Sequence, residues 1–309
     1  MRIAIIGPGA MGSLFGAYLL RAGHELLLID HNNTRARTIG QEGLRLHEGD
    51  TLHRFTVDAT ANPLPPSPDS PYDLILVMVK AQQTAKAAET AAKIATDETL
   101  ILTLQNGLGG AEILCKVLGE ERVLVGVTSQ GATLLGHGEV RHGGNGETII
   151  GPAAPASKHA AELARIFTEA GLEARWEEGI SLHLWKKLCA NCGINAITAL
   201  ANIKNGKIYS HPEAAAVCAD AVRETVRVAT ASATRLGDEE KIVSWVLSVA
   251  KATSANRSSM GQDVDRRRVT EVDFINGAVM REGALHGVPT PVNATLFRLI
   301  KTLETNFKS

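Results

Sequence analysis

Three polar side chains recur at every fourth position of an otherwise apolar stretch in the second half of the chain. They are Lys187, Asn191 and Asn195. On a helix each step of four residues turns by about 40° and rises by about 6 Å, so one ammonium and two carboxamides form a polar stripe about 12 Å long. Because buried polar groups need hydrogen-bonding partners, the stripe predicts either a substrate cleft or an interhelical hydrogen-bond network, and both remain open.

A carboxylate is the second candidate for chemistry. Glu271 flanks the apolar face of a helix that we predict over Asp263–Leu285, and we expect its side chain to be half-buried. A carboxylate in that setting can act as an acid or orient a lysine. The structural alternative is a capping or interhelical acid.

Two polar residues follow predicted strands in the first half of the chain. Lys80 directly follows an apolar run at Leu74–Val79, and Asn106 lies just past a run at Leu100–Leu104. In an open α/β sheet, ligands bind beyond the carboxyl ends of the strands. We therefore favour ligand contact for both residues over a surface lysine and a plain Asn-Gly turn.

A glycine-rich turn joins the first predicted strand to the first predicted helix, and it reads Gly7-Pro8-Gly9-Ala10-Met11-Gly12. Gly7 suits the sharp turn, Gly9 lets the backbone approach a pyrophosphate, and Gly12 permits close packing of helix on strand. The helix N-terminus offers unpaired N–H groups and a partial positive charge to phosphates. This context predicts that the turn binds a dinucleotide.

The residues after the second predicted strand bear on which dinucleotide binds. Asp30 ends that strand, where a carboxylate can accept hydrogen bonds from the ribose hydroxyls of NAD and repel the 2′-phosphate of NADP. His31, Arg35 and Arg37 follow, and they can either hold such a phosphate or form a solvated helix start. NAD and NADP therefore both remain open.

The order of the predicted elements indicates the fold. Apolar runs alternate with helical patterns over the first 150 residues or so, which predicts an α/β N-terminal domain with a Rossmann-type doubly wound parallel sheet. Beyond about residue 180 only helical patterns remain, which predicts an all-α C-terminal domain. We expect domains at residues 1–178 and 179–309.

The expected strands are Ile3–Ile6, Glu25–Ile29, Leu74–Val79, Leu100–Leu104, Val123–Val127, Thr148–Ile150 and Leu172–Trp176. The expected helices are Leu14–Ala22, Thr84–Ala95, Ala111–Leu118, Lys158–Ala170, Leu182–Leu200, Pro212–Leu236, Glu239–Thr253, Asp263–Leu285 and Pro291–Leu303.

Composition argues against several classes of protein. The net charge of −1 over 309 residues gives no electrostatic footprint for nucleic acid or an anionic membrane surface. No apolar run reaches the length of a membrane span, and the glycine turn begins too early for a signal peptide, so we expect a cytoplasmic protein. Cys189 and Cys192 form a C-x-x-C pair inside an apolar helical stretch, and we expect buried structural thiols rather than redox or metal chemistry.

These motifs together resemble the ketopantoate reductases (2-dehydropantoate 2-reductases) over essentially the whole chain. The resemblance rests, in chain order, on the glycine turn, Val79-Lys80-Ala81, Gln105-Asn106-Gly107, Leu184-Trp185-Lys186-Lys187-Leu188 with Asn191 and Ile194-Asn195, and Ser258-Ser259-Met260 with Asp263 and Thr270-Glu271.

The resemblance implies reduction of the C2 ketone of 2-dehydropantoate to (R)-pantoate by NADPH, on the route to pantothenate and coenzyme A. It implies that Lys187, rather than Lys186, is the general acid, and that Glu271 contacts substrate and supports the lysine. The expected substrate-binding residues are Asn106, Asn191, Asn195, Asn205, Asn256 and Ser259. The expected cofactor-binding residues are Gly7, Pro8, Gly9, Ala10, Met11, Gly12, Asp30, His31, Lys80 and Asn106, and no metal site is expected.

One departure from the family pattern concerns the cofactor. Members that use NADPH often carry an arginine just after the second strand, where this chain has His31 after Asp30. The alternatives to ketopantoate reduction are a related reductase of another 2-oxo acid and a dinucleotide-binding regulator without catalysis. The presence of both the lysine and the carboxylate argues against the regulator. The apolar helices of the second half can pack internally or across a homodimer, so the oligomeric state stays open.

Overall fold

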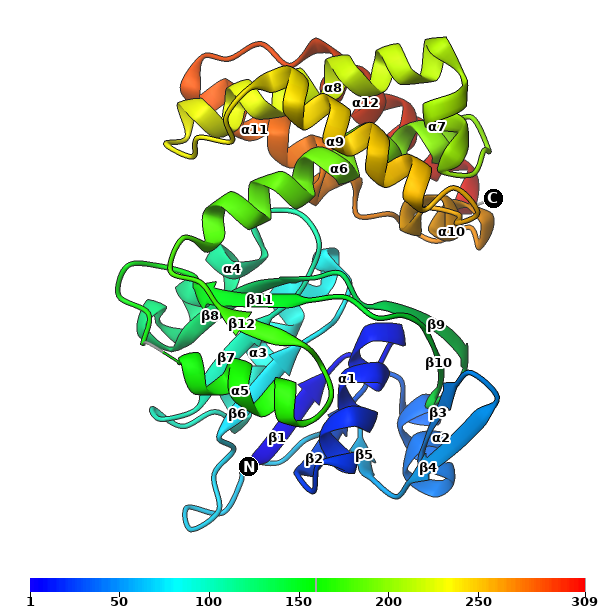
Figure 1. The fold of residues 1–309 in the computed structure, drawn as a ribbon. Helices are drawn as coiled ribbons and strands as arrows, with labels where there is room; N and C mark the ends of the chain where they lie inside the picture. The colour runs from blue at the N-terminus through cyan, green and yellow to red at the C-terminus, as the bar shows by residue number, and fades with distance from the viewer. Residues whose placement is uncertain (159, 309) are drawn as a thin grey trace. The chain divides into compact units, whose positions relative to one another are not determined.

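The computed structural model describes residues 1–158 and 160–308. They form two compact units (Figure 1). The first consists of Met1–Gln105 and Gly110–Ile180, and the second of Asn106–Gly109 and Ser181–Ser309. The sequence predicts a single boundary near residue 178. It does not indicate that Asn106–Gly109 belong to the second unit, although the chain before and after them belongs to the first. No helix among the described residues is long and apolar enough to cross a bilayer.

An eight-stranded sheet is the frame of the first unit. Its strand order is β12-β11-β8-β7-β6-β1-β2-β5. The strands are β1 (Arg2–Ile6), β2 (Glu25–Ile29), β5 (Asp58–Thr60), β6 (Leu74–Val77), β7 (Leu100–Thr103), β8 (Val123–Thr128), β11 (Thr148–Pro152) and β12 (Ala174–Trp176). All the expected strands are present, and the expected Rossmann-type α/β architecture is confirmed.

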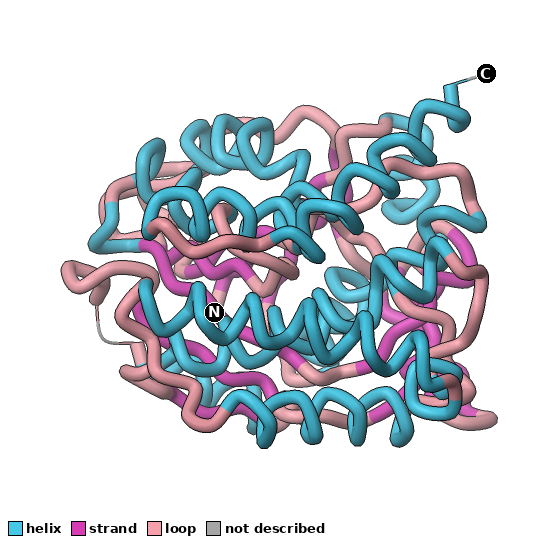
Figure 2. The backbone as a smooth tube through the Cα atoms, turned by 90° about the horizontal axis from the view of Figure 1, so that it is seen from above, coloured by secondary structure: helices cyan, strands magenta, loops and turns pink. Residues whose placement is uncertain are grey.

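Helices cover both faces of this sheet because its strands are apolar on both sides. Ile3 and Ile5 of β1 belong to the core beneath α1 (Ala10–Arg21) and α5 (Ala161–Glu169), whereas Ala4 and Ile6 belong to the core beneath α3 (Thr84–Ile94) and α4 (Gly110–Leu118). The remaining helix, α2 (Asn33–Glu42), follows β2. Figure 2 distinguishes the helices (cyan) from the strands (magenta) along the backbone. The helix predicted over Lys158–Ala170 includes residue 159, which lies outside the described residues.

The prediction of a wholly parallel sheet is wrong at one position. β8 and β11 pair antiparallel, whereas every other neighbouring pair in this sheet is parallel. Parallel neighbours need a crossover connection, usually a helix. Between β8 and β11 the chain instead makes a hairpin of β9 (Gly131–Gly136) and β10 (Glu139–Gly144).

A second, four-stranded sheet that the sequence did not predict packs against α1. It contains that hairpin together with β3 (Leu44–Glu48) and β4 (Thr51–Phe55), in the order β4-β3-β10-β9 (Figure 1). Leu44 and Leu46 of β3 and Val140 of β10 are fully buried in the core around α1. The strands of this sheet carry charged, histidine and glycine residues among their apolar ones, so their apolar pattern is weak.

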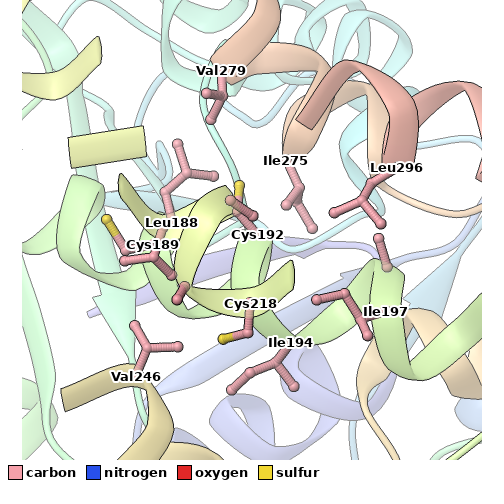
Figure 3. Close-up of a cluster of buried hydrophobic side chains, with 14 of the residues drawn as sticks. Leu188, Cys189, Cys192, Ile194, Ile197, Cys218, Val246, Ile275, Val279 and Leu296 are labelled. Carbon is pink, nitrogen blue, oxygen red and sulfur yellow. The ribbon is translucent and has the colours of Figure 1, made fainter. Parts of the chain in front are cut away.

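The second unit is helical, as predicted. It contains α6 (Ile180–Leu200), α7 (Gly206–Ser210), α8 (Pro212–Ala231), α9 (Glu239–Ala252), α10 (Ser259–Asp265), α11 (Asn276–His286) and α12 (Pro291–Thr305). Its core gathers around α6, where Cys189 and Cys192 lie among aliphatic side chains near Cys218 of α8 (Figure 3). All three thiols are free and buried, as expected for Cys189 and Cys192, and burial raises the pKa of Cys189 to about 12.

The helix predicted over Asp263–Leu285 is wrong. The chain leaves α10 at Arg267, which adopts the left-handed conformation (φ 52°), and the N–H of Arg268 closes the helix end on the carbonyl of Asp263 at 2.8 Å. A single turn of 3₁₀ helix (Val272–Phe274) then precedes α11. No glycine stands at this helix end, and the apolar residues continue with helical spacing beyond it, so the sequence predicted one uninterrupted helix. Glu271 consequently lies in a turn and not on a helix.

Candidate active site

The glycine turn packs tightly against its surroundings at two positions and leaves the third open. A Cβ atom on Gly7, whose φ is +95°, would lie 2.7 Å from the backbone nitrogen of Val79, and one on Gly12 would lie 2.3 Å from the carbonyl oxygen of Gly7. A Cβ on Gly9 would meet nothing within 4 Å. Gly7 and Gly12 therefore shape the turn, and the open space lies over Gly9.

The N-terminus of α1 suits an anion. Gly9 is its N-cap, and no side chain caps the helix. The N–H of Ser13 donates to the carbonyl of Gly9 at 2.8 Å. The N–H groups of Ala10, Met11 and Gly12 lie in the first turn, where intrahelical acceptors are lacking. The hydroxyl of Ser13 holds the carbonyl of Pro8 at 3.1 Å and so fixes the turn. An open glycine beside an uncapped helix end fits a dinucleotide pyrophosphate.

Asp30 holds a fixed carboxylate at the end of β2. It is 6% exposed, and one oxygen accepts from the N–H of Asn32 at 2.8 Å and from the guanidinium of Arg35 at 2.6 Å. His31 is largely exposed, 3.6 Å from the same oxygen. Arg35 thus lies on the carboxylate in this structure rather than in solvent.

Lys80 lies three residues past the end of β6 and opens a short 3₁₀ turn. A residue that the sequence analysis gave no role, Gln105, fastens this segment to the end of β7. Its amide donates to the carbonyl of Val79 at 2.7 Å and to the hydroxyl of Thr84 at 2.8 Å, and its oxygen accepts from Thr103 at 2.9 Å. The position of a glutamine just past a buried apolar strand is the signal that could have identified it.

The polar stripe lies on α6, in the second unit, as predicted. The amide nitrogens of Asn191 and Asn195 are buried, and neither has a hydrogen-bond partner among the described residues. Buried polar groups are nearly always bonded, so an amide without a partner indicates that something outside the chain supplies one. Of the two interpretations left open by the spacing, this observation favours the substrate cleft over the interhelical network.

Lys187 lies close enough to the Glu271 carboxylate for its pKa to be affected by that charge. Burial lowers the pKa of Lys187 to about 8, and the Glu271 carboxylate acts in the opposite direction. Glu271 is 5% exposed, hence fully rather than half buried, and the amide of Asn106 donates to it at 3.3 Å. The neighbouring Lys186 instead stacks over the ring of Trp245 at 4.6 Å. Of these two neighbouring lysines, Lys187 is therefore the one whose pKa the Glu271 carboxylate affects.

The remaining expected substrate residues lie beyond the C-terminal end of α6. Asn205 donates its N–H to the carbonyl of Asn256 at 3.0 Å, and its own side-chain oxygen is buried without a partner among the described residues. Asn256 and Ser259 are exposed. The preceding residue, Ser258, caps α10 and accepts from the Thr198 hydroxyl at 2.7 Å, which ties α10 to α6.

An arginine missed by the sequence analysis strengthens the same tie. Arg257 donates to the carbonyls of Thr198 and Ile203 at 2.7 and 2.8 Å and pairs with Asp265 at 2.8 Å. It holds the segment that carries Asn256 and Ser259 against the end of α6. No spacing rule in the sequence distinguishes this arginine from a surface residue.

The chain matches two family models that together span most of its length. Ketopantoate reductase PanE/ApbA matches residues 3–155, and its C-terminal counterpart matches residues 180–304. The 2-dehydropantoate 2-reductase of Halobacterium salinarum is 36% identical over 302 residues, which is 97% of this chain and 98% of that protein. The enzyme of the same name from Vibrio cholerae is 35% identical over 312 residues, covering 99% of both chains.

Solved structures are also similar to this chain over its whole length. A PanE/ApbA family ketopantoate reductase from Ralstonia eutropha is 32% identical, with a TM-score of 0.90 over 100% of both chains. A ternary structure of D-mandelate dehydrogenase with NADH and anilino(oxo)acetate is 28% identical, with a TM-score of 0.93 over 100% of this chain and 99% of that one. With two family models matched and full-length relatives above 30% identity, the chain belongs to the ketopantoate reductase family.

Proposed function

We propose that this protein reduces the C2 ketone of 2-dehydropantoate to the hydroxyl of (R)-pantoate with a nicotinamide cofactor. The observation that carries the proposal is that Asn191 and Asn195, on the helix of Lys187, have buried amide nitrogens with no hydrogen-bond partner in the part of the chain that the structure describes. Two neutral donors beside a protonatable amine suit a small, polar and anionic substrate. The family membership and the names of the full-length relatives support the same substrate.

Lys187 is the proton donor in this proposal. The bound nicotinamide supplies the hydride to the C2 carbon, and negative charge develops on the ketone oxygen. The ammonium of Lys187 stabilises that charge and transfers a proton to the oxygen, which completes the hydroxyl. A pKa of about 8 makes the ammonium a better proton donor than an ordinary lysine while leaving it protonated at neutral pH.

The other site residues bind and orient the substrate. The amides of Asn191 and Asn195 donate to it and thereby gain the partners that the described residues do not give them. Glu271 keeps Lys187 charged and accepts from a substrate hydroxyl, and Asn106 holds the Glu271 carboxylate. Asn205, Asn256 and Ser259 complete the substrate set.

The cofactor pyrophosphate is held by the glycine turn, which consists of Gly7, Pro8, Gly9, Ala10, Met11 and Gly12. Lys80 and Asn106 contact the cofactor as well, each from a segment that follows a strand end. Asp30 binds the adenosine ribose beside His31. We propose that NADH serves at least as well as NADPH. The fixed carboxylate can accept from ribose hydroxyls and repels a 2′-phosphate, and Arg35 would have to leave Asp30 to bind that phosphate.

The direct test is to mix the purified protein with 2-dehydropantoate and NADH or NADPH and to follow the loss of nicotinamide absorbance. We expect turnover with 2-dehydropantoate to exceed that with an aryl 2-oxo acid such as benzoylformate. A preference for the aryl acid would favour the alternative of another 2-oxo acid, and the absence of oxidation with any pair would reject the reductase. The cytoplasmic location stays a prediction, and the oligomeric state, with a homodimer as one possibility, stays open.

A further inference from the structure

Glu271 is held in place by a carboxylate at the far end of the last helix. Glu304 of α12 is 7% exposed, and a single oxygen of its side chain accepts from both the backbone N–H of Thr270, at 2.8 Å, and the hydroxyl of Thr270, at 2.7 Å. Thr270 immediately precedes Glu271 and is itself 1% exposed. The residue before the candidate acid is thus fixed by two buried, charge-assisted hydrogen bonds.

The hydroxyl of Thr270 also holds the residue on the other side. It accepts from the N–H of Val272 at 3.2 Å while it donates to Glu304. The N–H groups on both sides of Glu271 are therefore fixed, that of Thr270 by the Glu304 carboxylate and that of Val272 by the Thr270 hydroxyl. On the C-terminal side the carbonyl of Glu271 accepts from the N–H groups of Phe274 and Ile275 at 3.0 and 3.1 Å. On the N-terminal side residues 268–270 belong to no helix or strand, so the bonds of Thr270 are what fix the chain there.

The next residues of the turn are fastened to the same helix and to the partner of Glu271. Lys301 bridges Asp273 at 2.9 Å and the second oxygen of Glu304 at 3.0 Å. The carbonyl of Phe274 accepts from the N–H of Leu108 at 2.9 Å. Leu108 lies two residues after Asn106, so the two side chains that meet at the Asn106–Glu271 hydrogen bond are carried by segments bonded to each other.

We propose that Thr270 and Glu304 are positioning residues that aim the carboxylate of Glu271 at Lys187. Neither residue touches the substrate, and both act through the turn that carries Glu271. The inference rests on the proposed function, in which Glu271 keeps Lys187 charged. A clamp that only stabilised the fold would not need to converge on the two peptide groups beside Glu271.

The test combines catalysis with a measurement that needs no substrate. Thr270→Val removes the hydroxyl with little change of shape, and Glu304→Ala removes its acceptor. For each variant, kcat and KM for 2-dehydropantoate are measured. The pKa of Lys187 is read from the NMR titration of ¹³C-dimethylated lysines, with its signal assigned by its loss in Lys187→Arg.

We expect kcat to fall by about 10- to 100-fold in both variants, the loss typical of a misplaced catalytic group. The pKa of Lys187 should fall as well, because a Glu271 carboxylate that has moved away opposes the effect of burial less. Glu304→Gln should stay within about threefold of the wild type, since its amide oxygen can accept both hydrogen bonds from Thr270.

Thr225→Val is the matched control. Thr225 is also fully buried in the second unit, and its hydroxyl donates to the carbonyl of Ala221 at 2.8 Å, away from the turn. We expect this variant to lose stability but to keep kcat and the pKa of Lys187. The proposal is overturned if Thr270→Val and Glu304→Ala behave like this control, or if kcat falls while the pKa of Lys187 stays unchanged. If the wild type does not reduce 2-dehydropantoate and the pKa still falls, the proposed function fails and the positioning role stands.

Discussion

The lowered pKa of Lys187 makes the pH dependence of the reaction a sharp test of its role. A proton donor must be protonated in the free enzyme, so kcat/KM should fall as the pH rises through the pKa of Lys187, about 8. A group with that pKa is about 90% protonated at pH 7 and about 10% at pH 9. We therefore expect kcat/KM for 2-dehydropantoate to fall by about tenfold between these values. An unperturbed lysine would remain more than about 95% protonated over the same range.

The measurement is the initial rate of nicotinamide oxidation at low substrate concentration in buffers of constant ionic strength. Lys187→Arg is the control, since a guanidinium does not deprotonate in this range. The variant should be slower, and the alkaline fall should disappear. A wild-type profile that is flat to pH 9, or an alkaline fall that persists in Lys187→Arg, would refute the assignment of the titrating group.

Two further predictions concern the substrate amides and the cofactor. Asn195→Leu should raise KM for 2-dehydropantoate by about tenfold, the cost of one lost hydrogen bond. It should not lower the free energy of unfolding, because the amide nitrogen that it removes is buried and bonds to none of the described residues. Urea denaturation measures the second effect, and a large loss of stability would show that the amide serves the fold. Asp30→Asn keeps an acceptor for the N–H of Asn32 but removes the charge, so the ratio of kcat/KM for NADPH to that for NADH should rise by about tenfold, equivalent to ~1.4 kcal/mol of repulsion. An unchanged ratio would mean that Asp30 does not face the ribose.

The sequence predicts the first unit well where its strands are buried on both faces. Runs such as Leu74–Val77 and Leu100–Thr103 are apolar throughout, and such runs flanked by helical patterns have few other interpretations. The glycine turn was equally readable, because Gly7 and Gly12 are required by backbone contacts that no larger residue permits. By contrast, the four-stranded sheet against α1 is partly exposed, and its strands resemble loops in sequence.

The sequence predicted which side chains form the candidate site, but not the hydrogen bonds that hold the turn around Glu271. The helical spacing located Lys187, Asn191 and Asn195 on one helix, because a period of about four residues is visible within a single segment of the sequence. The turn that carries Glu271 depends on Glu304, which is 34 residues from Thr270 in sequence, and on a helix end at Arg267 that no glycine marks. Such long-range hydrogen bonds produce no periodic pattern in the sequence, so the sequence predicted a continuous helix where the structure has a turn.

The most direct test of the account is the turnover of 2-dehydropantoate by Lys187→Ala, with Lys186→Ala as its matched neighbour. Lys186 packs over Trp245 and takes no part in the proposed proton transfer. We expect Lys187→Ala to lower kcat by about 100-fold or more, the usual contribution of a general acid, and Lys186→Ala to leave kcat nearly unchanged. Comparable activity in Lys187→Ala and the wild type, or a severe loss confined to Lys186→Ala, would show that Lys187 is not the proton donor.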